Sequence, residues 1–169
     1  MNNKRKFVLI IISIIVLFWL VGFVRKYCIY YNAPDSSYGS AYSGKIYEVI
    51  EGEHTAFVIG SKNSVVVERK DRGWKVPAKT YISAESIQNV DGLVIYLARY
   101  NSTNEYYVTV SGNGGDELSI SDNQNSDFCR VNVEQKGFSS GVQGYFAYVK
   151  DVDENYVITI NGRDIKLIE

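Results

Sequence analysis

The stretch "VITINGRDIKLI", Val157 to Ile168, carries the most specific structural signal in this chain. Asn161 and Gly162 stand between two short apolar segments, and an Asn-Gly pair readily supplies the two positive φ angles of a type I′ turn. Such a turn joins neighbouring antiparallel strands. The sequence therefore predicts a tight β-hairpin at the C-terminus.

Upstream of this hairpin, short apolar runs rich in Val, Ile, Tyr and Thr alternate with turn residues, which is typical of strands. No window of eleven or more residues after Gly44 has a helical period. The predicted strands cover 45–51, 55–60, 64–70, 93–100, 105–111, 144–150, 156–160 and 163–168. We therefore expect an all-β domain over residues 45–169, folded as one antiparallel β-sandwich. An Ig-like arrangement or a partly closed barrel is the alternative.

A long apolar segment precedes this domain. Residues 7–24, "FVLIIISIIVLFWLVGFV", contain no charged side chain. As a helix they would be about 27 Å long, enough to cross the hydrocarbon core of a bilayer. Arg25, Lys26 and Tyr27 follow, and none of them suits a signal peptidase or the position before a lipidated cysteine. We expect residues 7–24 to be retained as a transmembrane signal-anchor helix of a single-pass protein.

Charges on either side of this segment predict its orientation. Residues 1–6 contain three basic side chains besides the terminal amine, whereas two basic residues follow the segment. By the positive-inside rule, the N-terminus is cytoplasmic and the C-terminal domain is extracytoplasmic, at the cell membrane. Residues 25–44 are expected to form a juxtamembrane segment and flexible linker, because 32–44 are rich in Ser, Gly and Asn.

The charge of the C-terminal part argues against two classes of partner. Residues 42–169 hold 13 basic and 18 acidic side chains, a net charge of −5. Nucleic acids and anionic lipid surfaces are bound by clustered Lys and Arg, and this part of the sequence contains no such cluster. We expect no nucleic acid partner. The expected partners are the bilayer, through residues 7–24, and an envelope protein or glycan.

Residue types that often carry catalysis are few. His54 is the only histidine and is interpreted as a solvated turn residue. The two cysteines, Cys28 and Cys129, are expected to be unpaired thiols. We expect no catalytic residue and no cofactor.

Two loops resemble parts of calcium sites. Asp151, Asp153 and Asn155 have the spacing that begins an EF-hand loop, but Tyr156 and Gly162 stand where that loop requires Gly and Glu. The segment "SGNGGDEL", residues 111–118, resembles one unit of a calcium repeat that works only when stacked. Both are interpreted as plain loops. Asp151, Asp153 and Asn155 are kept as metal-ligand candidates. Residues 118–127, "LSISDNQNSD", are interpreted as a long polar loop, with a polar ligand site as the alternative.

Tyrosine is unusually abundant, with 14 residues in the chain. Exposed tyrosine rings in a row offer flat apolar area to a sugar or a peptide, whereas cross-strand aromatic pairs that stabilise a sheet give the same sequence pattern. The candidate ligand-binding residues are Tyr96, Tyr100, Tyr106, Tyr107, Tyr145 and Tyr148.

These features favour a membrane-anchored extracytoplasmic β domain that binds or supports another component of the cell envelope without catalysis. An immunity or inhibitor protein acting at the membrane surface is one alternative. A hydrolase that uses carboxylates alone is another, since Asp and Glu are plentiful.

Overall fold

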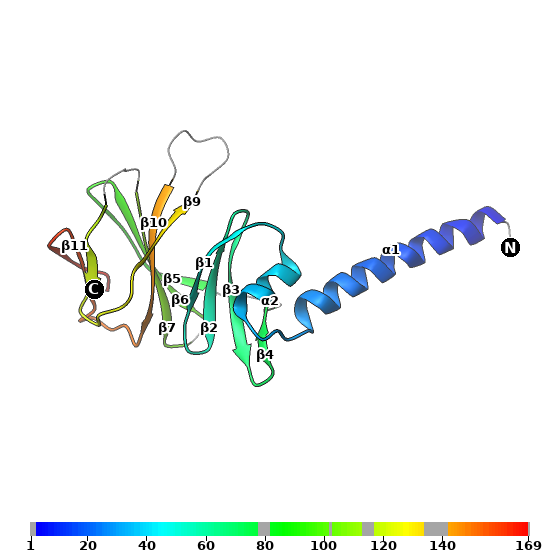
Figure 1. Ribbon diagram of the computed structural model, residues 1–169, viewed down its shortest axis with the longest axis horizontal. Helices are drawn as coiled ribbons and strands as arrows, with labels where there is room; N and C mark the ends of the chain where they lie inside the picture. Colours follow the sequence, from blue (N-terminus) through cyan, green and yellow to red (C-terminus); the bar gives the residue numbers. More distant parts are fainter. Residues whose placement is uncertain (1–2, 78–81, 102, 113–116, 134–141, 169) are drawn as a thin grey trace.

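The computed structural model places one long N-terminal helix beside a domain of antiparallel sheets (Figure 1). It describes residues 3–77, 82–101, 103–112, 117–133 and 142–168. The described residues after the first helix are mostly in strands, apart from one short second helix. The expectation of a mainly β domain is therefore confirmed.

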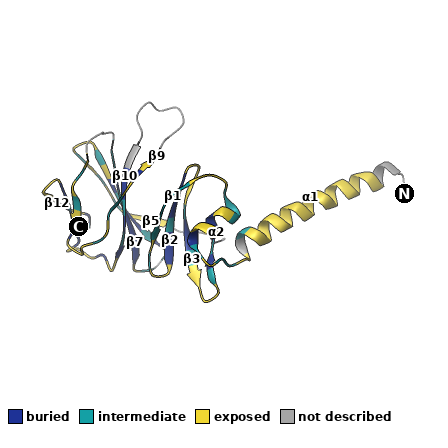
Figure 2. Ribbon diagram, in the orientation of Figure 1, coloured by how far each residue is buried: buried dark blue, intermediate teal, exposed yellow. Residues whose placement is uncertain are grey.

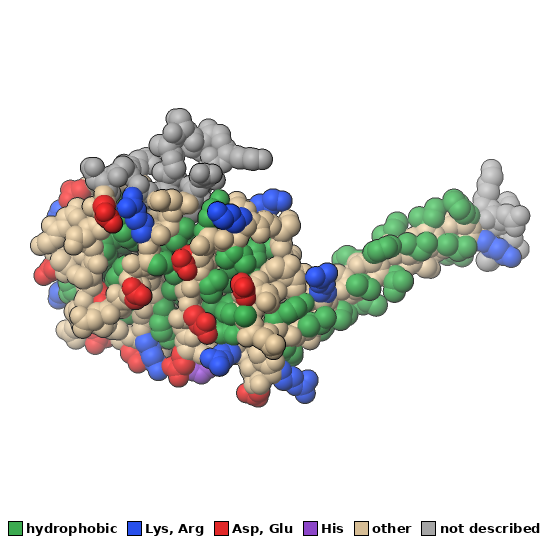
Figure 3. All heavy atoms as spheres, viewed as in Figure 1, with side chains coloured by type: hydrophobic (Ala, Val, Ile, Leu, Met, Phe, Trp, Pro, Cys, Tyr) green, Lys and Arg blue, Asp and Glu red, His purple; other side chains and the backbone are tan. Residues whose placement is uncertain are grey.

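Helix α1 (Asn3–Tyr27) extends away from the domain. Its segment Lys6–Lys26 is long and apolar enough to cross a membrane, and none of it is buried inside the protein (Figure 2). Figure 3 shows apolar side chains along the visible length of the helix and basic side chains near both ends. A helix that is apolar on every side suits hydrocarbon better than water. The described chain thus has one N-terminal helix able to span a bilayer by length and composition.

Three sheets make up the domain. The four-stranded sheet has the order β1-β2-β3-β4, with β1 Ile46–Glu51, β2 Thr55–Gly60, β3 Ser64–Lys70 and β4 Gly73–Lys75. The five-stranded sheet has the order β5-β6-β7-β10-β9, with β5 Ile82–Val90, β6 Leu93–Tyr100, β7 Glu105–Gly112, β10 Val142–Lys150 and β9 Cys129–Val133. The three-stranded sheet has the order β12-β11-β8, with β12 Arg163–Lys166, β11 Val157–Ile160 and β8 Ile120–Asp122.

The sheets stack in layers with the five-stranded sheet in the middle (Figure 1). One of its faces packs on the three-stranded sheet, where Val108 of β7 meets Ile158 of β11 in the largest hydrophobic core. The other face packs on the four-stranded sheet, where Tyr107 of β7 shares a smaller core with Val66 of β3. Successive residues of β7 therefore serve two different cores, as the period of two along a strand requires.

A single two-sheet sandwich is not confirmed, because the described residues form three sheets. The physical reason lies in β7, whose first four residues are all buried. A strand that is apolar on both faces needs a cover on each side, and one partner sheet can cover only one. The three-stranded sheet supplies the second cover.

The expectation of a flexible linker over residues 32–44 is corrected by helix α2 (Pro34–Ala41), which covers the outer face of the four-stranded sheet. Tyr38 of α2 is fully buried, and its hydroxyl donates to the carbonyl of Asn63 at 3.1 Å. Gly60 leaves the room for this hydroxyl, since a Cβ atom there would lie 2.1 Å from it. A helix of eight residues is too short to be stable alone, so these tertiary contacts hold it.

The C-terminal hairpin is confirmed. β11 and β12 pair antiparallel, and Asn161 and Gly162 between them have φ angles of 50° and 79°, as a type I′ turn requires. Asp91 and Gly92 make a second such turn between β5 and β6, with φ angles of 52° and 81°. The sequence interpretation missed this second hairpin because β5 was not recognised as a strand. It also missed the short strands β4, β8 and β9.

Candidate functional site

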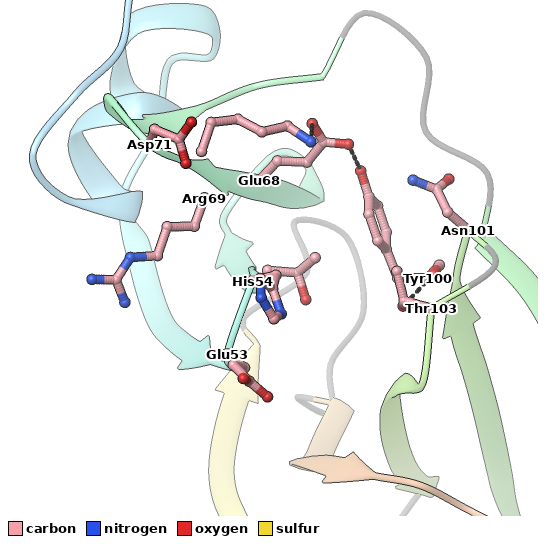
Figure 4. Close-up of a pocket in the computed structure, with 10 residues that line it drawn as sticks. Glu53, His54, Glu68, Arg69, Asp71, Tyr100, Asn101 and Thr103 are labelled. Atoms are coloured by element: carbon pink, nitrogen blue, oxygen red, sulfur yellow. Dashed lines mark hydrogen bonds and ion pairs between the residues drawn. The ribbon is translucent and has the colours of Figure 1, made fainter.

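A polar cleft of about 660 Å³ opens where three turns of the four-stranded and five-stranded sheets meet (Figure 4). The β1–β2 turn, the end of β3 and the β6–β7 turn form its walls. Its lining residues are Glu53, His54, Thr55, Glu68, Arg69, Lys70, Asp71, Tyr100, Asn101 and Thr103.

A buried carboxylate links the two sheets beside this cleft. Glu105, the first residue of β7, is only 3% exposed. Its Oε1 accepts hydrogen bonds from the His54 backbone N–H at 2.7 Å and the Tyr148 hydroxyl at 3.1 Å. Its Oε2 accepts one from the Thr55 hydroxyl at 3.1 Å, and the hydroxyls of Thr55 and Tyr107 lie 2.6 Å apart. Neutral donors thus satisfy the charge of Glu105 on both oxygens.

The environment keeps the two tyrosine hydroxyls of this network protonated. Burial, reinforced by the negative charge of Glu105, raises the pKa of Tyr148 to about 12. Burial chiefly, with Glu105 adding to it, also raises the pKa of Tyr107 well above its ordinary value. Both hydroxyls therefore keep their protons across the physiological range.

The carboxylates that line the cleft are mostly engaged. Glu68 accepts a hydrogen bond from the buried Tyr100 hydroxyl, drawn in Figure 4, and its other oxygen lies 3.2 Å from Lys70 Nζ. Glu53 pairs with Lys150 Nζ at 2.5 Å, and this hydrogen bond lowers the pKa of Glu53. Two of the three acidic residues on the cleft wall are therefore held by cations or donors of the chain itself.

His54 has the exposed position expected from the sequence. Its side chain is 69% exposed, and Nδ1 lies 3.8 Å from Oε1 of Glu105. The two threonines that line the cleft, Thr55 and Thr103, donate to Glu105 and to the carbonyl of Tyr100 respectively, and the Tyr100 hydroxyl donates to Glu68. Among the described lining residues, none of these hydroxyls is poised as a nucleophile for His54.

Four of the six candidate tyrosines are core residues. Tyr106 and Tyr145 lie in the core beneath the three-stranded sheet, and Tyr100 and Tyr107 lie in the core beneath the four-stranded sheet. Their rings are therefore not free to stack on a ligand, which matches the sheet-stabilising alternative. Tyr96 and Tyr148 are half-buried.

The metal-ligand candidates lie in the β10–β11 loop. The Asn155 backbone N–H donates to Oδ1 of Asp153 at 2.8 Å, which is the hydrogen bond of a polar turn. The described residues contain no group of three or more His, Cys, Asp or Glu side chains that could hold a metal ion. Residues 113–116 of the second calcium-like segment lie outside the described residues.

The polar loop over residues 118–127 contains β8 and a buried carboxylate. Asp122 is 7% exposed and accepts a hydrogen bond from the buried Tyr156 hydroxyl at 2.9 Å. Its other oxygen accepts from the backbone N–H groups of Gln124 and Ser126. These bonds fasten the loop to the three-stranded sheet, so the side chain of Asp122 is structural.

One face of the five-stranded sheet is only partly covered, and the sequence interpretation missed this surface because it missed β5. Ile87, Ile82 and Val94 are 59%, 43% and 39% exposed. The register of β5 and β6 sets them on the same face as Ala84, which is exposed, and Tyr96. We call these five residues the β5–β6 shelf. Within the described residues β5 pairs only with β6, so its outer edge has a free backbone.

We expect Cys129 to react with a disulfide reagent such as DTNB at pH 8 about a hundredfold more slowly than an ordinary thiol. Burial, together with nearby Glu48 and Asp127, raises the pKa of Cys129 to about 11. Little thiolate is present below that pH, so the rate should rise about tenfold per pH unit from 8 to 10. The measurement compares Cys28→Ser, which leaves Cys129, with Cys129→Ser, which leaves the exposed Cys28. Equal rates for the two variants would contradict it.

Comparison with protein-family models, curated proteins and solved structures gave no significant match.

Proposed function

We propose that this protein is a membrane-anchored extracytoplasmic module that binds another protein of the cell envelope and has no catalytic activity of its own. The observation that carries the proposal is the β5–β6 shelf, an apolar surface beside a free strand edge. Scattered exposed apolar side chains are ordinary on proteins, but a group of them on one sheet face marks an interaction surface.

The partner class follows from the shape of this surface. The nine residues of β5 have an unpaired outer edge among the described strands. An extended segment can add to such an edge through backbone hydrogen bonds, and its side chains can then contact Ile82 and Ile87. We therefore propose that the shelf binds an extended peptide segment of another envelope protein.

The orientation in the proposal is supported by charge alone. Three basic residues and the terminal amine precede the apolar part of α1, and Arg25 and Lys26 follow it. This difference favours a cytoplasmic N-terminus and an extracytoplasmic domain. Protease added to intact cells should then degrade the domain, and protection of the domain would overturn this part.

A carboxylate hydrolase has less support. Such enzymes need one carboxyl group as acid and another as base or nucleophile, both free to reach the substrate. In the cleft, Glu53 is paired with Lys150, and Glu68 is held by Tyr100 and Lys70. Asp71 alone among the described acidic lining residues has no such partner in the cleft.

The test is site-specific photocrosslinking of the full-length protein in its native membrane. A photoreactive amino acid at position 87 should give a discrete adduct with a second protein, and adding Val94→Asp should remove that adduct. The same amino acid at Glu117, which is 81% exposed and lies beside Arg130 of β9 at the opposite edge of the five-stranded sheet, is the matched control. The proposal fails if position 87 gives no adduct or gives the same adducts as position 117. A captured toxin would favour the immunity alternative.

A further inference from the structure

A backbone joint fixes the end of α1 to the domain. Tyr31 exchanges two backbone hydrogen bonds with Trp74 of β4, each 2.7 Å long. The Tyr31 hydroxyl also donates to the carbonyl of Arg25, in the last turn of α1, at 3.2 Å. Gly73, with a φ angle of 119°, permits this approach because a Cβ atom there would lie 2.4 Å from the Tyr31 carbonyl oxygen. The helix and β4 are therefore held close together.

The joint brings basic side chains from distant parts of the sequence to the same place. Lys26, at the end of α1, has its Nζ 4.5 Å from the centroid of the Tyr42 ring. Lys75 of β4 has its Nζ 5.6 Å from the centroid of the Tyr30 ring. Each ammonium group thus lies over an aromatic face that is close to the membrane end of the domain.

A third cation lies over the tryptophan of the joint. The Arg69 guanidinium carbon is 5.8 Å from the centroid of the Trp74 ring. No ion pair joins Arg25, Arg69 or Lys75 to a described acidic side chain. Their charges are therefore available to an external anion. We use the name juxtamembrane collar for a set of four basic residues and three aromatic rings. The set consists of Arg25, Lys26, Arg69 and Lys75 with the rings of Tyr30, Tyr42 and Trp74.

We propose that the juxtamembrane collar binds the phosphate groups of anionic lipids in the leaflet from which the domain emerges. This rests on the proposed function, because α1 must cross the bilayer. Arg25 and Lys26 end the span, so the collar lies at the depth of the headgroups, where Lys, Arg, Tyr and Trp are favoured. Phosphate oxygens accept strong hydrogen bonds from ammonium and guanidinium groups.

This docking surface was hidden at the level of sequence by the net charge of the domain. The domain carries more acidic than basic residues, and Figure 3 shows several acidic side chains on the face in view. Arg69 and Lys75 are separated from Lys26 by more than forty residues, and the pairing of Tyr31 with Trp74 helps to bring them together in the fold. The collar therefore holds the domain against the bilayer in one orientation instead of leaving it on a loose tether.

The test is lysine footprinting of the full-length chain in lipid nanodiscs. A water-soluble acetylating reagent is applied in nanodiscs of phosphatidylcholine alone and in nanodiscs that contain phosphatidylglycerol, and each lysine is followed by mass spectrometry. We expect acetylation of Lys75 to slow by at least about threefold in the anionic nanodiscs and to recover at high salt. Lys166 of β12, which is exposed, should react at the same rate in both.

Two variants distinguish specific binding by the collar from a general electrostatic attraction of the protein to the anionic bilayer surface. Gly73→Val should remove the protection of Lys75 but leave that of Lys26, which belongs to α1. Arg69→Gln, a surface change that spares the fold, should reduce the protection of Lys75. Equal acetylation of Lys75 in both kinds of nanodisc overturns the proposal, and so does protection by free inorganic phosphate in phosphatidylcholine nanodiscs. Failure of the chain to enter nanodiscs would instead contradict the membrane anchor of the proposed function.

Discussion

Replacing Glu105 with alanine is expected to lower the free energy of unfolding by about 3–5 kcal/mol, a large share of the stability of a small domain. The carboxylate is 3% exposed and accepts hydrogen bonds from His54, Thr55 and Tyr148. The variant leaves these three donors without their acceptor inside the contact between two sheets, and each buried unsatisfied group costs about 1–3 kcal/mol. Chemical denaturation of the full-length chain in mild detergent measures the change.

Two further variants make this result specific to the buried carboxylate. Glu117→Ala removes an acidic side chain that is 81% exposed and 3.6 Å from Arg130, and it should change stability by less than about 0.5 kcal/mol. Glu105→Gln keeps the shape of the side chain but turns an amide N–H₂ toward groups that donate, so its cost should be intermediate. If Glu105→Ala behaves like Glu117→Ala, the carboxylate does not join the sheets.

The parts of the fold that could be predicted are those with a local cause. The hairpin at Asn161 and Gly162 needs only two residues that tolerate positive φ between two apolar strands. By contrast, β5 carries a register shift between Ala84 and Ser86 and is exposed along much of its length. The shift breaks the alternation on which strand prediction depends, so β5 and its shelf were missed.

Helix α2 could not be predicted because its stability comes from residues elsewhere in the sequence. Its segment is rich in Ser and Gly, which favours a loop. Its conformation is decided by Tyr38, whose hydroxyl fits where Gly60 has no side chain and donates to the carbonyl of Asn63. A pattern read along residues 32–44 contains no trace of that contact.

The candidate site was beyond prediction for a similar reason. Glu105 is one acidic residue at the start of a strand, and its partners His54 and Thr55 lie about fifty positions away. The tyrosines posed a different difficulty, since alternation assigns a ring to a face without saying what covers that face. Both faces of β7 are covered, so Tyr106 and Tyr107 point in opposite directions and are both buried.

A chain that ends at Ile160 is expected not to form the native domain. The deletion removes β12, and with it Ile165 and Leu167, which are 8% and 2% exposed in the largest core. Loss of one such side chain typically costs about 2–5 kcal/mol, so the two together approach the whole stability of a small domain. The deletion also leaves β11 with an unpaired edge next to exposed apolar surface. Circular dichroism and limited proteolysis of the full-length and shortened proteins in mild detergent would detect the loss.

Point variants show whether core packing or strand pairing causes this effect. Leu167→Ala keeps the hairpin and should destabilise the protein by about 2–5 kcal/mol, because only the packing is lost. Lys166→Ala, on an exposed position of β12, should change the unfolding midpoint little, since surface substitutions usually stay within about 0.5 kcal/mol. A shortened chain with the parent's unfolding midpoint would make β12 an appendage. The five-stranded sheet would then have to bury Val108 and Ile95 without it, although both are fully buried in the core to which β12 contributes Ile165.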